Sequence, residues 1–209
     1  MDERASLRAW AYGWSLSRVT PRPVPVVGGV RIALHRPPGA GRYVLTTFDR
    51  APETTVGTEI KVLSDSATLR TALDDRWTMY AACELMTTRF SAAPTAVPGG
   101  YDARVILRGE VAVAQVSDAE GVTVSAGRLA RWGRHGIVDQ VETRPEHRGR
   151  GLATAVMAVL GDWALTHGLQ TGLLAATAQG ASLYRRLGWD ERGEIAGAVR
   201  RSVRECGPA

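Results

Sequence analysis

The sequence predicts an α/β protein with a central mixed, mostly antiparallel sheet and helices on both faces. Several runs between residues 29 and 143 alternate apolar and polar residues and are bounded by glycine or proline, as half-buried strands are. From residue 152 the period changes, because apolar residues at 152, 156, 159, 160 and 163 form one helical stripe. A short apolar strand at 173–176 and a second helix at 181–187 complete the pattern.

The first hundred residues predict an α/β region of their own. A helix is expected at 5–17, where Trp10 and Trp14 lie one turn apart on one face. Strands follow at 29–35, 42–48 and 59–63, and Ser66 is placed to cap a helix at 66–73. The apolar stretch 77–90 fits a long strand or a buried helix equally well. Residues 91–102 hold two prolines and two glycines, so we expect a linker there, between regions 1–100 and 101–209.

The second region predicts strands at 104–107, 110–116, 122–132 and 137–143. In the last of these, the two-residue period places Asp139 on one face with Val141 and Thr143, and Glu142 on the other. Gly168 is placed to end the long helix and Gly188 the second one, and a closing strand is expected at 194–203.

Composition limits the class of protein. A chain of 209 residues and 22.4 kDa fits one large domain or two small ones. Cys83 and Cys206 are the only cysteines, too few for a disulfide framework or a zinc cluster, so we expect no metal and a reducing cytoplasm. No apolar run approaches the ~18 residues of a membrane span, and the charged N-terminus does not resemble a secretory signal.

The charge balance favours a ligand that carries phosphate. The formal net charge is +5, and all but one of the 26 basic residues are arginines, whose guanidinium groups match phosphate oxygens. The alternative is that these arginines simply form a solvated surface. Lys61 is the only lysine, which excludes a P-loop and argues against a Schiff-base mechanism.

The stretch 141–153, V-E-T-R-P-E-H-R-G-R-G-L-A, joins a strand to the long helix. The first N–H groups of a helix lack intrahelical partners and, with the helix dipole, form an anion site. Gly149 and Gly151 allow close approach of a ligand, and Arg148 and Arg150 add charged donors. The stretch therefore predicts a pyrophosphate cradle. A dinucleotide fold is disfavoured, because Thr154 replaces the third glycine and no acidic residue stands near 170.

Two motifs resemble the GNAT N-acetyltransferase superfamily. Its acetyl-CoA loop reads Gln or Arg, two variable residues, Gly, one variable residue, then Gly or Ala; Arg148, Gly151 and Ala153 match it. Its later strand-to-helix motif resembles residues 177–189, T-A-Q-G-A-S-L-Y-R-R-L-G-W, with Tyr184 in register. Here Thr177 replaces the usual Asn and Gly180 the usual Ala, and the resemblance is clear over about 103–200.

This resemblance implies a GNAT-type fold, with residues 1–100 forming either its first part or a degenerate lobe. It implies that a substrate amine attacks the thioester of acetyl-CoA directly and that Tyr184 protonates the departing thiolate. The strand segment expected to pair with the pantetheine arm is Val141, Glu142 and Thr143. The loop expected to hold the pyrophosphate is Arg148, Gly149, Arg150, Gly151, Leu152, Ala153 and Thr154.

The general base is left open by the sequence. Many relatives carry a Glu where this chain has Gly172. Asp139 is the first candidate, because it lies on the strand that is expected to splay. Glu142 faces the other way unless a bulge rotates it. His135 and a water molecule are the remaining candidates.

The expected function is therefore an acetyl-CoA-dependent N-acetyltransferase acting on a small-molecule or peptide amine. A non-catalytic acyl-CoA-binding or regulatory protein is the main alternative, because the family Asn and Glu are absent. An aminoacyl-tRNA-dependent acyltransferase is a weaker one, because the arginines show no nucleic-acid-binding pattern, so no nucleic-acid partner is expected. The acceptor, the acyl-chain length and the oligomeric state stay open, and a homodimer is compatible with the resemblance. Acceptor contacts are to be sought near residues 79–86.

Overall fold

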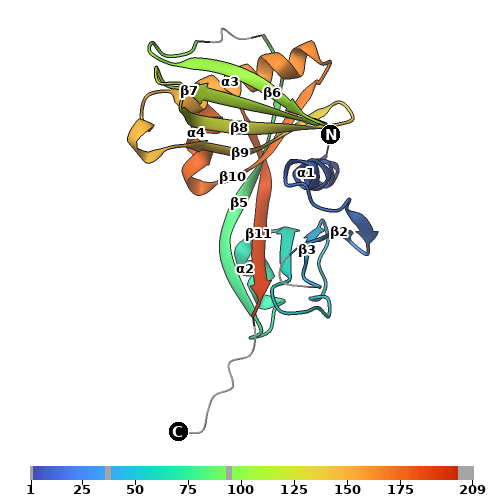
Figure 1. Cartoon of the computed structure of the whole chain (residues 1–209). Helices are drawn as coiled ribbons and strands as arrows, with labels where there is room; N and C mark the ends of the chain where they lie inside the picture. Colours follow the sequence, from blue (N-terminus) through green and yellow to red (C-terminus); the bar gives the residue numbers. More distant parts are fainter. Residues whose placement is uncertain (1, 36–38, 93–95, 202–209) are drawn as a thin grey trace, which may run out of the picture.

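The computed structural model describes residues 2–35, 39–92 and 96–201, and its strands form one mixed sheet. The strand order is β1-β2-β3-β4-β11-β5-β10-β9-β8-β7-β6. Two neighbouring pairs, β3–β4 and β9–β10, are parallel, and the others are antiparallel. The predicted mixed, mostly antiparallel sheet is therefore confirmed (Figure 1).

The predicted elements occur in the predicted order with shifted ends, and strand β1 and a 3-10 turn, which were not predicted, are added to them. The helices are α1 (Glu3–Ser17), α2 (Ser66–Thr71), the 3-10 turn Pro145–His147, α3 (Leu152–Thr166) and α4 (Ala178–Arg186). The strands of the first half are β1 (Val24–Val26), β2 (Gly29–Ala33), β3 (Gly41–Leu45), β4 (Glu59–Leu63) and β5 (Trp77–Arg89). Those of the second are β6 (Asp102–Arg108), β7 (Val111–Ser117), β8 (Thr123–Trp132), β9 (His135–Thr143), β10 (Thr171–Thr177) and β11 (Asp190–Arg200).

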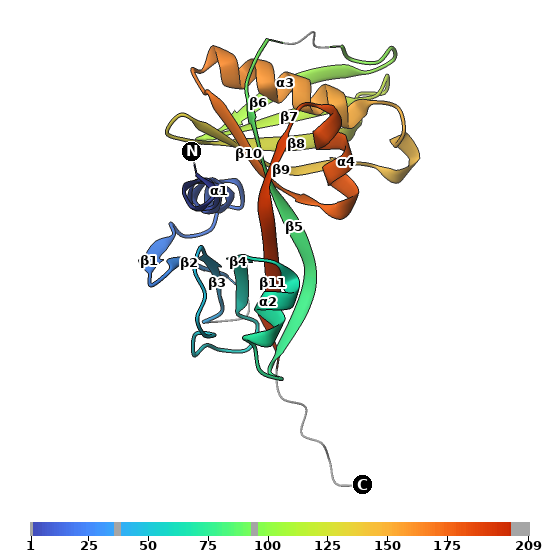
Figure 2. The same ribbon diagram turned by 180° about the vertical axis from the view of Figure 1, so that it is seen from behind.

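Two long strands, β5 and β11, connect the two halves of the sheet (Figures 1 and 2). The ambiguous stretch at 77–90 is a strand, because β5 is paired on both sides, with β10 and with β11. β11 also pairs with β4, so the last strand of the chain is inserted beside a strand of the first half. Backbone pairing thus crosses the division predicted at residue 100, which stays a prediction. Residues 93–95 of the expected linker, residues 202–203 of the expected last strand and Cys206 lie outside the described residues.

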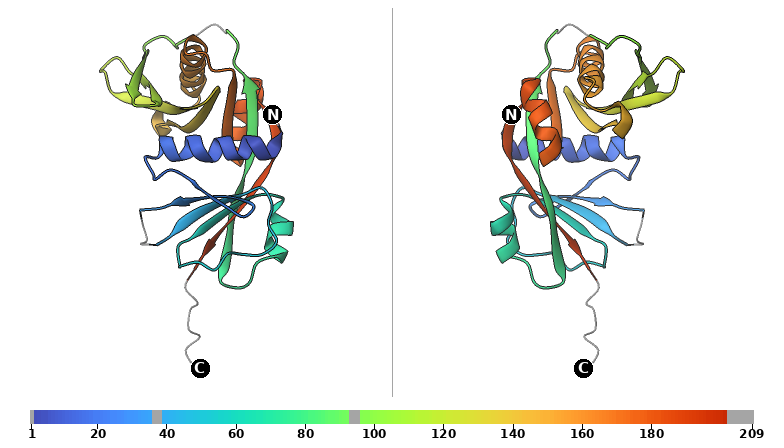
Figure 3. Two further views of the ribbon diagram at one scale, coloured as in Figure 1. Left: turned by 90° about the vertical axis from the view of Figure 1, so that its right-hand side faces the viewer. Right: turned by 90° about the vertical axis from the view of Figure 1, so that its left-hand side faces the viewer.

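Helices cover both faces of the sheet, as predicted. α1 packs against β8, β9 and β10 on one face and also contacts β2 and β3, so it lies between the two halves of the sheet (Figure 3). Asp2 caps this helix by accepting a hydrogen bond from Ala5 N at 2.7 Å. Leu7, Trp10 and Trp14 share its buried face and pack in one cluster with Ile137.

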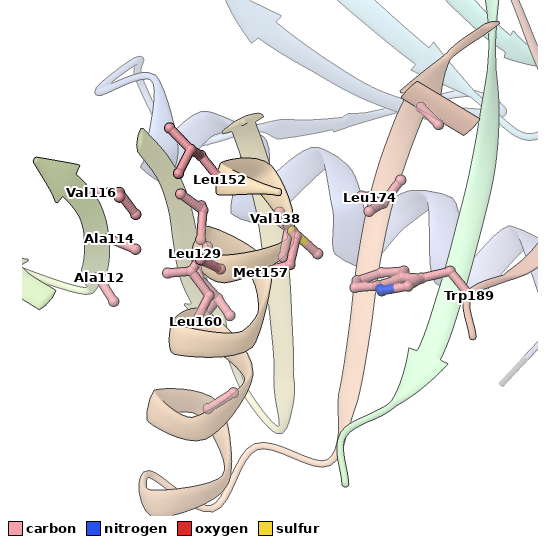
Figure 4. Packing of buried hydrophobic residues seen from close by; sticks show 14 of the residues in the cluster. Ala112, Ala114, Val116, Leu129, Val138, Leu152, Met157, Leu160, Leu174 and Trp189 are labelled. Atoms are coloured by element: carbon pink, nitrogen blue, oxygen red, sulfur yellow. The ribbon is translucent and has the colours of Figure 1, made fainter. Parts of the chain in front are cut away.

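α3 covers the opposite face and forms the larger core. Its buried residues Leu152, Met157 and Leu160 face side chains of β7, β8 and β9, among them Leu129 and Val138 (Figure 4). A Cβ at Gly127 of β8 would lie 2.6 Å from Val156 of α3, so only glycine allows this close approach of helix and sheet. Close packing of α3 fixes where its N-terminus lies, which positions the site.

A bulge in β9 corrects one prediction. Asp139 pairs with Arg128 and Glu142 with Ala126, so one residue is inserted between them, and Gln140 has a φ of 53°. Such a bulge breaks the two-residue alternation of side chains. Asp139 therefore lies on the α1 face, whereas Val141 packs in the α3 core. The prediction that Asp139 shares a face with Val141 and Thr143 is wrong.

Candidate active site

A cleft opens where β9 and β10 separate. The parallel pairing of these strands ends at Ile137 and Leu173, although β9 continues to Thr143 and β10 to Thr177. Beyond that point β9 pairs only with β8, so its other edge presents unpaired backbone groups. The cleft has a volume of about 1230 Å³ and contains Val141, Glu142 and Thr143 in its wall.

One end of the cleft is formed by the N-terminus of α3. Gly149 and Gly151 have φ values of 73° and 78°, a left-handed conformation that favours glycine. Gly151 is the N-cap and supplies no side chain to the free N–H groups of the first turn. Arg148 lies beside them and donates from Nε to the carbonyl of Thr143 at 3.1 Å. This geometry suits an anionic ligand, with donors and the positive end of the helix dipole directed to one place.

The predicted loop residues line this end, with one exception. The lining includes Arg148, Gly149, Gly151, Leu152, Ala153 and Thr154. Arg150 does not line the cleft, because it donates to Tyr101 Oη at 2.9 Å and to the carbonyl of Glu146 at 3.1 Å. His147 belongs to the same group of contacts, with Nδ1 3.1 Å from Tyr101 Oη.

Tyr184, on α4, lines the cleft. Thr177 caps this helix by accepting from Gly180 N at 3.3 Å, so it performs the capping role of the Asn expected there. A Cβ at Gly180 would lie 3.2 Å from the Tyr184 ring, so the glycine leaves room for that ring. Burial, and to a lesser extent the charge of Asp139, raise the pKa of Tyr184 to about 12. The phenol therefore stays protonated at neutral pH.

Asp139 lines the same cleft but is already engaged. Arg18 donates to its two oxygens at 2.6 and 3.0 Å, and Ser17 Oγ donates at 2.9 Å. These contacts hold the carboxylate in place in the wall of the cleft. A carboxylate has room for about four hydrogen bonds, so capacity for one more donor remains.

The other candidate bases differ in position. The bulge brings Glu142 to the face of Asp139, where it is exposed in the wall of the cleft. His135 stands at the far end of β9, outside the cleft lining, and burial lowers its pKa. Gly172 is enclosed, because a Cβ there would lie 2.6 Å from Trp189, so no acidic side chain fits at that position.

A further part of the cleft wall is built by the first half of the chain, which the sequence motifs did not assign to the site. Trp10 and Trp14 of α1, Arg42 of β3, Lys61 of β4 and Cys83 of β5 line it. Cys83 falls in the 79–86 region where acceptor contacts were to be sought. The signal for Lys61 was present in the sequence: it is the only lysine, within the apolar run Ile60–Val62.

Two other expectations can be compared with the structure. No helix in the described part of the chain is long and apolar enough to cross a membrane. Residues 2–35, 39–92 and 96–201 contain no group of three or more His, Cys, Asp or Glu side chains suited to holding a metal ion.

The chain is similar to known proteins in part of its sequence and in its fold. Residues 107–189 match the model of the acetyltransferase (GNAT) family. A GCN5-related N-acetyltransferase from Kribbella flavida has a similar fold, with a TM-score of 0.69, 13% identity, and coverage of 96% of this chain and 97% of that one. A putative GNAT-family acetyltransferase from Novosphingobium aromaticivorans gives a TM-score of 0.59 and 16% identity, covering 97% of this chain and 100% of that one. Such identities show the fold alone. No curated protein matches the chain.

Proposed function

We propose, on the match of residues 107–189 to the GNAT family model, that the protein transfers an acetyl group from acetyl-CoA to a primary amine. One observation carries the proposal: the free edge of β9, the N-terminus of α3 and Tyr184 line one continuous cleft. A ligand with a pyrophosphate at one end and a thioester at the other would extend along all three.

The residues of the cleft fit acetyl-CoA in this direction. The N–H groups at Gly151–Thr154 and the guanidinium of Arg148 hold the pyrophosphate. The unpaired edge of Val141–Thr143 offers backbone donors and acceptors to the amide groups of the pantetheine arm. Bound in this way, acetyl-CoA supplies an activated acetyl group near Tyr184.

The reaction needs two proton transfers. The amine nitrogen of the acceptor attacks the thioester carbon, a C–N bond forms, and the C–S bond breaks. Tyr184 donates its proton, through a hydrogen bond, to the departing sulfur. Asp139 accepts the proton that the amine loses, directly or through water, and its charge favours the positive nitrogen formed on attack. Arg18 and Ser17 hold this carboxylate in position.

The proposal includes a cytoplasmic location and an amine acceptor. Cys83 is a free thiol, which fits a reducing cytoplasm. The acceptor is a small molecule or peptide with a primary amine, and the protein acts alone or as a homodimer.

Release of the CoA thiol from acetyl-CoA, measured with a panel of primary amines, tests the proposal. We expect amine-dependent release by the wild type and a large loss in Tyr184→Phe. Arg76→Met is the matched control, because Arg76 is an exposed ion-pair partner of Asp74 outside the cleft. Binding of acetyl-CoA without release with any amine would contradict the proposal and favour the acyl-CoA-binding alternative.

A further inference from the structure

Lys61 is a buried cation whose charge the described part of the protein leaves unbalanced. Its residue is 7% exposed, in the middle of β4, which is paired on both sides. Among the described residues it forms no ion pair. Its Nζ lies 3.9 Å from the Cys83 thiol and 5.1 Å from the centre of the Tyr80 ring. Burial lowers the pKa of Lys61, which is the expected result when an ammonium lacks a close anion.

The carboxylate whose charge acts on Lys61, that of Glu59, is already engaged with another cation. Glu59 Oε2 accepts from Arg42 Nε at 2.9 Å and from Nη2 at 2.6 Å. The Arg42 guanidinium also lies 4.0 Å from the centre of the Trp14 ring. Burial raises the pKa of Tyr80, which therefore stays neutral. The group formed by Arg42, Lys61 and Glu59 therefore has a net charge of +1 when all three are ionised.

This excess charge faces open space. Lys61 and Arg42 line the large cleft, and they also line a hollow of about 340 Å³ with Glu59, Tyr80 and Val199. A buried charge is costly unless it is paired, so a site of this kind is completed by a ligand of opposite charge. One unbalanced positive charge requires a single negative charge.

We infer that the acceptor carries a carboxylate in addition to its amine, and that Lys61, with Arg42 beside it, binds this carboxylate. The inference rests on the proposed function, because it takes this part of the cleft as the acceptor side. Trp10 and Trp14, which are both buried, form an apolar wall for the part of the acceptor between its two charged groups. The acceptor class is thus amino acids or molecules with a similar amine and carboxylate.

Binding measurements test this inference independently of turnover. Isothermal titration, with free CoA present, would compare glycine, 4-aminobutanoate, 6-aminohexanoate and phenylalanine with the carboxamide of each. We expect at least one of these acids to bind about 10- to 100-fold more tightly than its amide. In Lys61→Met this preference should fall to about one, whereas Arg76→Met should keep it.

The outcomes separate the inference from the proposed function. If an acid is preferred in binding but no amine is acetylated, the proposed function fails and the carboxylate site stands. If amines are acetylated with equal kcat/KM for acid and amide, the carboxylate site is refuted and the function stands. Equal loss of acid and amide binding in Lys61→Met would also refute the carboxylate site. So would a dissociation constant above 10 mM for every acid, which corresponds to a binding free energy weaker than about 3 kcal/mol. Unchanged CoA affinity in Lys61→Met shows that the variant is folded.

Discussion

Replacing Tyr184 by Phe removes one hydroxyl and leaves the packing of the ring intact. The ring lies 6.1 Å from that of Trp189 and close to Gly180, and these contacts do not involve the hydroxyl. We therefore expect Tyr184→Phe to fold normally and to bind acetyl-CoA with unchanged affinity.

The expected loss of rate follows from the acidity of Tyr184. General acid catalysis contributes about 10²- to 10⁴-fold, and less when the acid is weak for the operating pH. Burial raises the pKa of Tyr184 to about 12, which makes it a weak acid. The effect should lie at the lower end, about 10²-fold in kcat, or about 2.7 kcal/mol at 1.36 kcal/mol for each factor of ten.

Initial rates of CoA thiol release with saturating acetyl-CoA measure this loss.

The free energy of unfolding, measured over a pH series, adds a second readout. Below pH 10 Tyr184 is protonated in both the folded and the unfolded protein, so the residue adds no pH dependence to stability. Above pH 10 the unfolded phenol ionises first, so the wild type loses stability between about pH 10 and 12. Tyr184→Phe should lose less. A kcat within twofold of the wild type, or a change confined to KM, would refute the assigned role.

Three further substitutions test other parts of the site. Gly151→Ala should weaken acetyl-CoA binding about tenfold in a calorimetric titration. An alanine held at the φ of 78° that Gly151 adopts is strained by about 1–2 kcal/mol, which disfavours the loop conformation that presents the N–H groups. Gly161→Ala, inside α3 with open space around it, is the control and should leave binding unchanged. Asp139→Asn should lower kcat/KM about 10²-fold, with the deficit shrinking as pH approaches the pKa of the acceptor amine; an unchanged rate would exclude Asp139 as proton acceptor. Lys61→Met should raise the free energy of unfolding at pH 7, since the buried ammonium binds its proton less well when folded, and the gain should vanish above about pH 10.4; a lower melting temperature at pH 7 would contradict this.

Local patterns in the sequence were sufficient to predict the helices and strands of the second half of the chain. The strand-loop-helix signal around Gly149 and Gly151 depends on neighbouring residues, and the structure has a strand, a loop and the N-terminus of α3 there, lining the cleft. Tyr184 was placed by its motif, and the structure brings it into the same cleft.

Long-range pairing was not predictable in the same way. The insertion of β11 between β4 and β5 depends on contacts between residues far apart in sequence, which periodicity does not report. The bulge at Gln140 reversed the face of Asp139 relative to Val141, and no glycine marked its position. Similarly, Arg150 follows the loop pattern but is drawn away by Tyr101, a residue of a different segment.

The part of the cleft that we propose to bind the acceptor was missed because its residues come from segments that match no motif. Trp10 and Trp14 have the spacing of an ordinary buried helix face, and most of their surface is indeed buried in the core. Only the fold brings them beside Arg42 and Lys61. A lone lysine within an apolar strand was the available clue, since a charge in such a position needs a partner.

Thermal unfolding of the wild type with and without acetyl-CoA tests the central claim most directly, because that claim is a cleft built for this cosubstrate. At about 100 times its dissociation constant a ligand stabilises by about 2.7 kcal/mol, which raises the melting temperature by roughly 5–10 °C for a chain of this size. We predict that rise for the wild type and a smaller one for Gly151→Ala at the same concentration. No rise at millimolar acetyl-CoA would contradict the account.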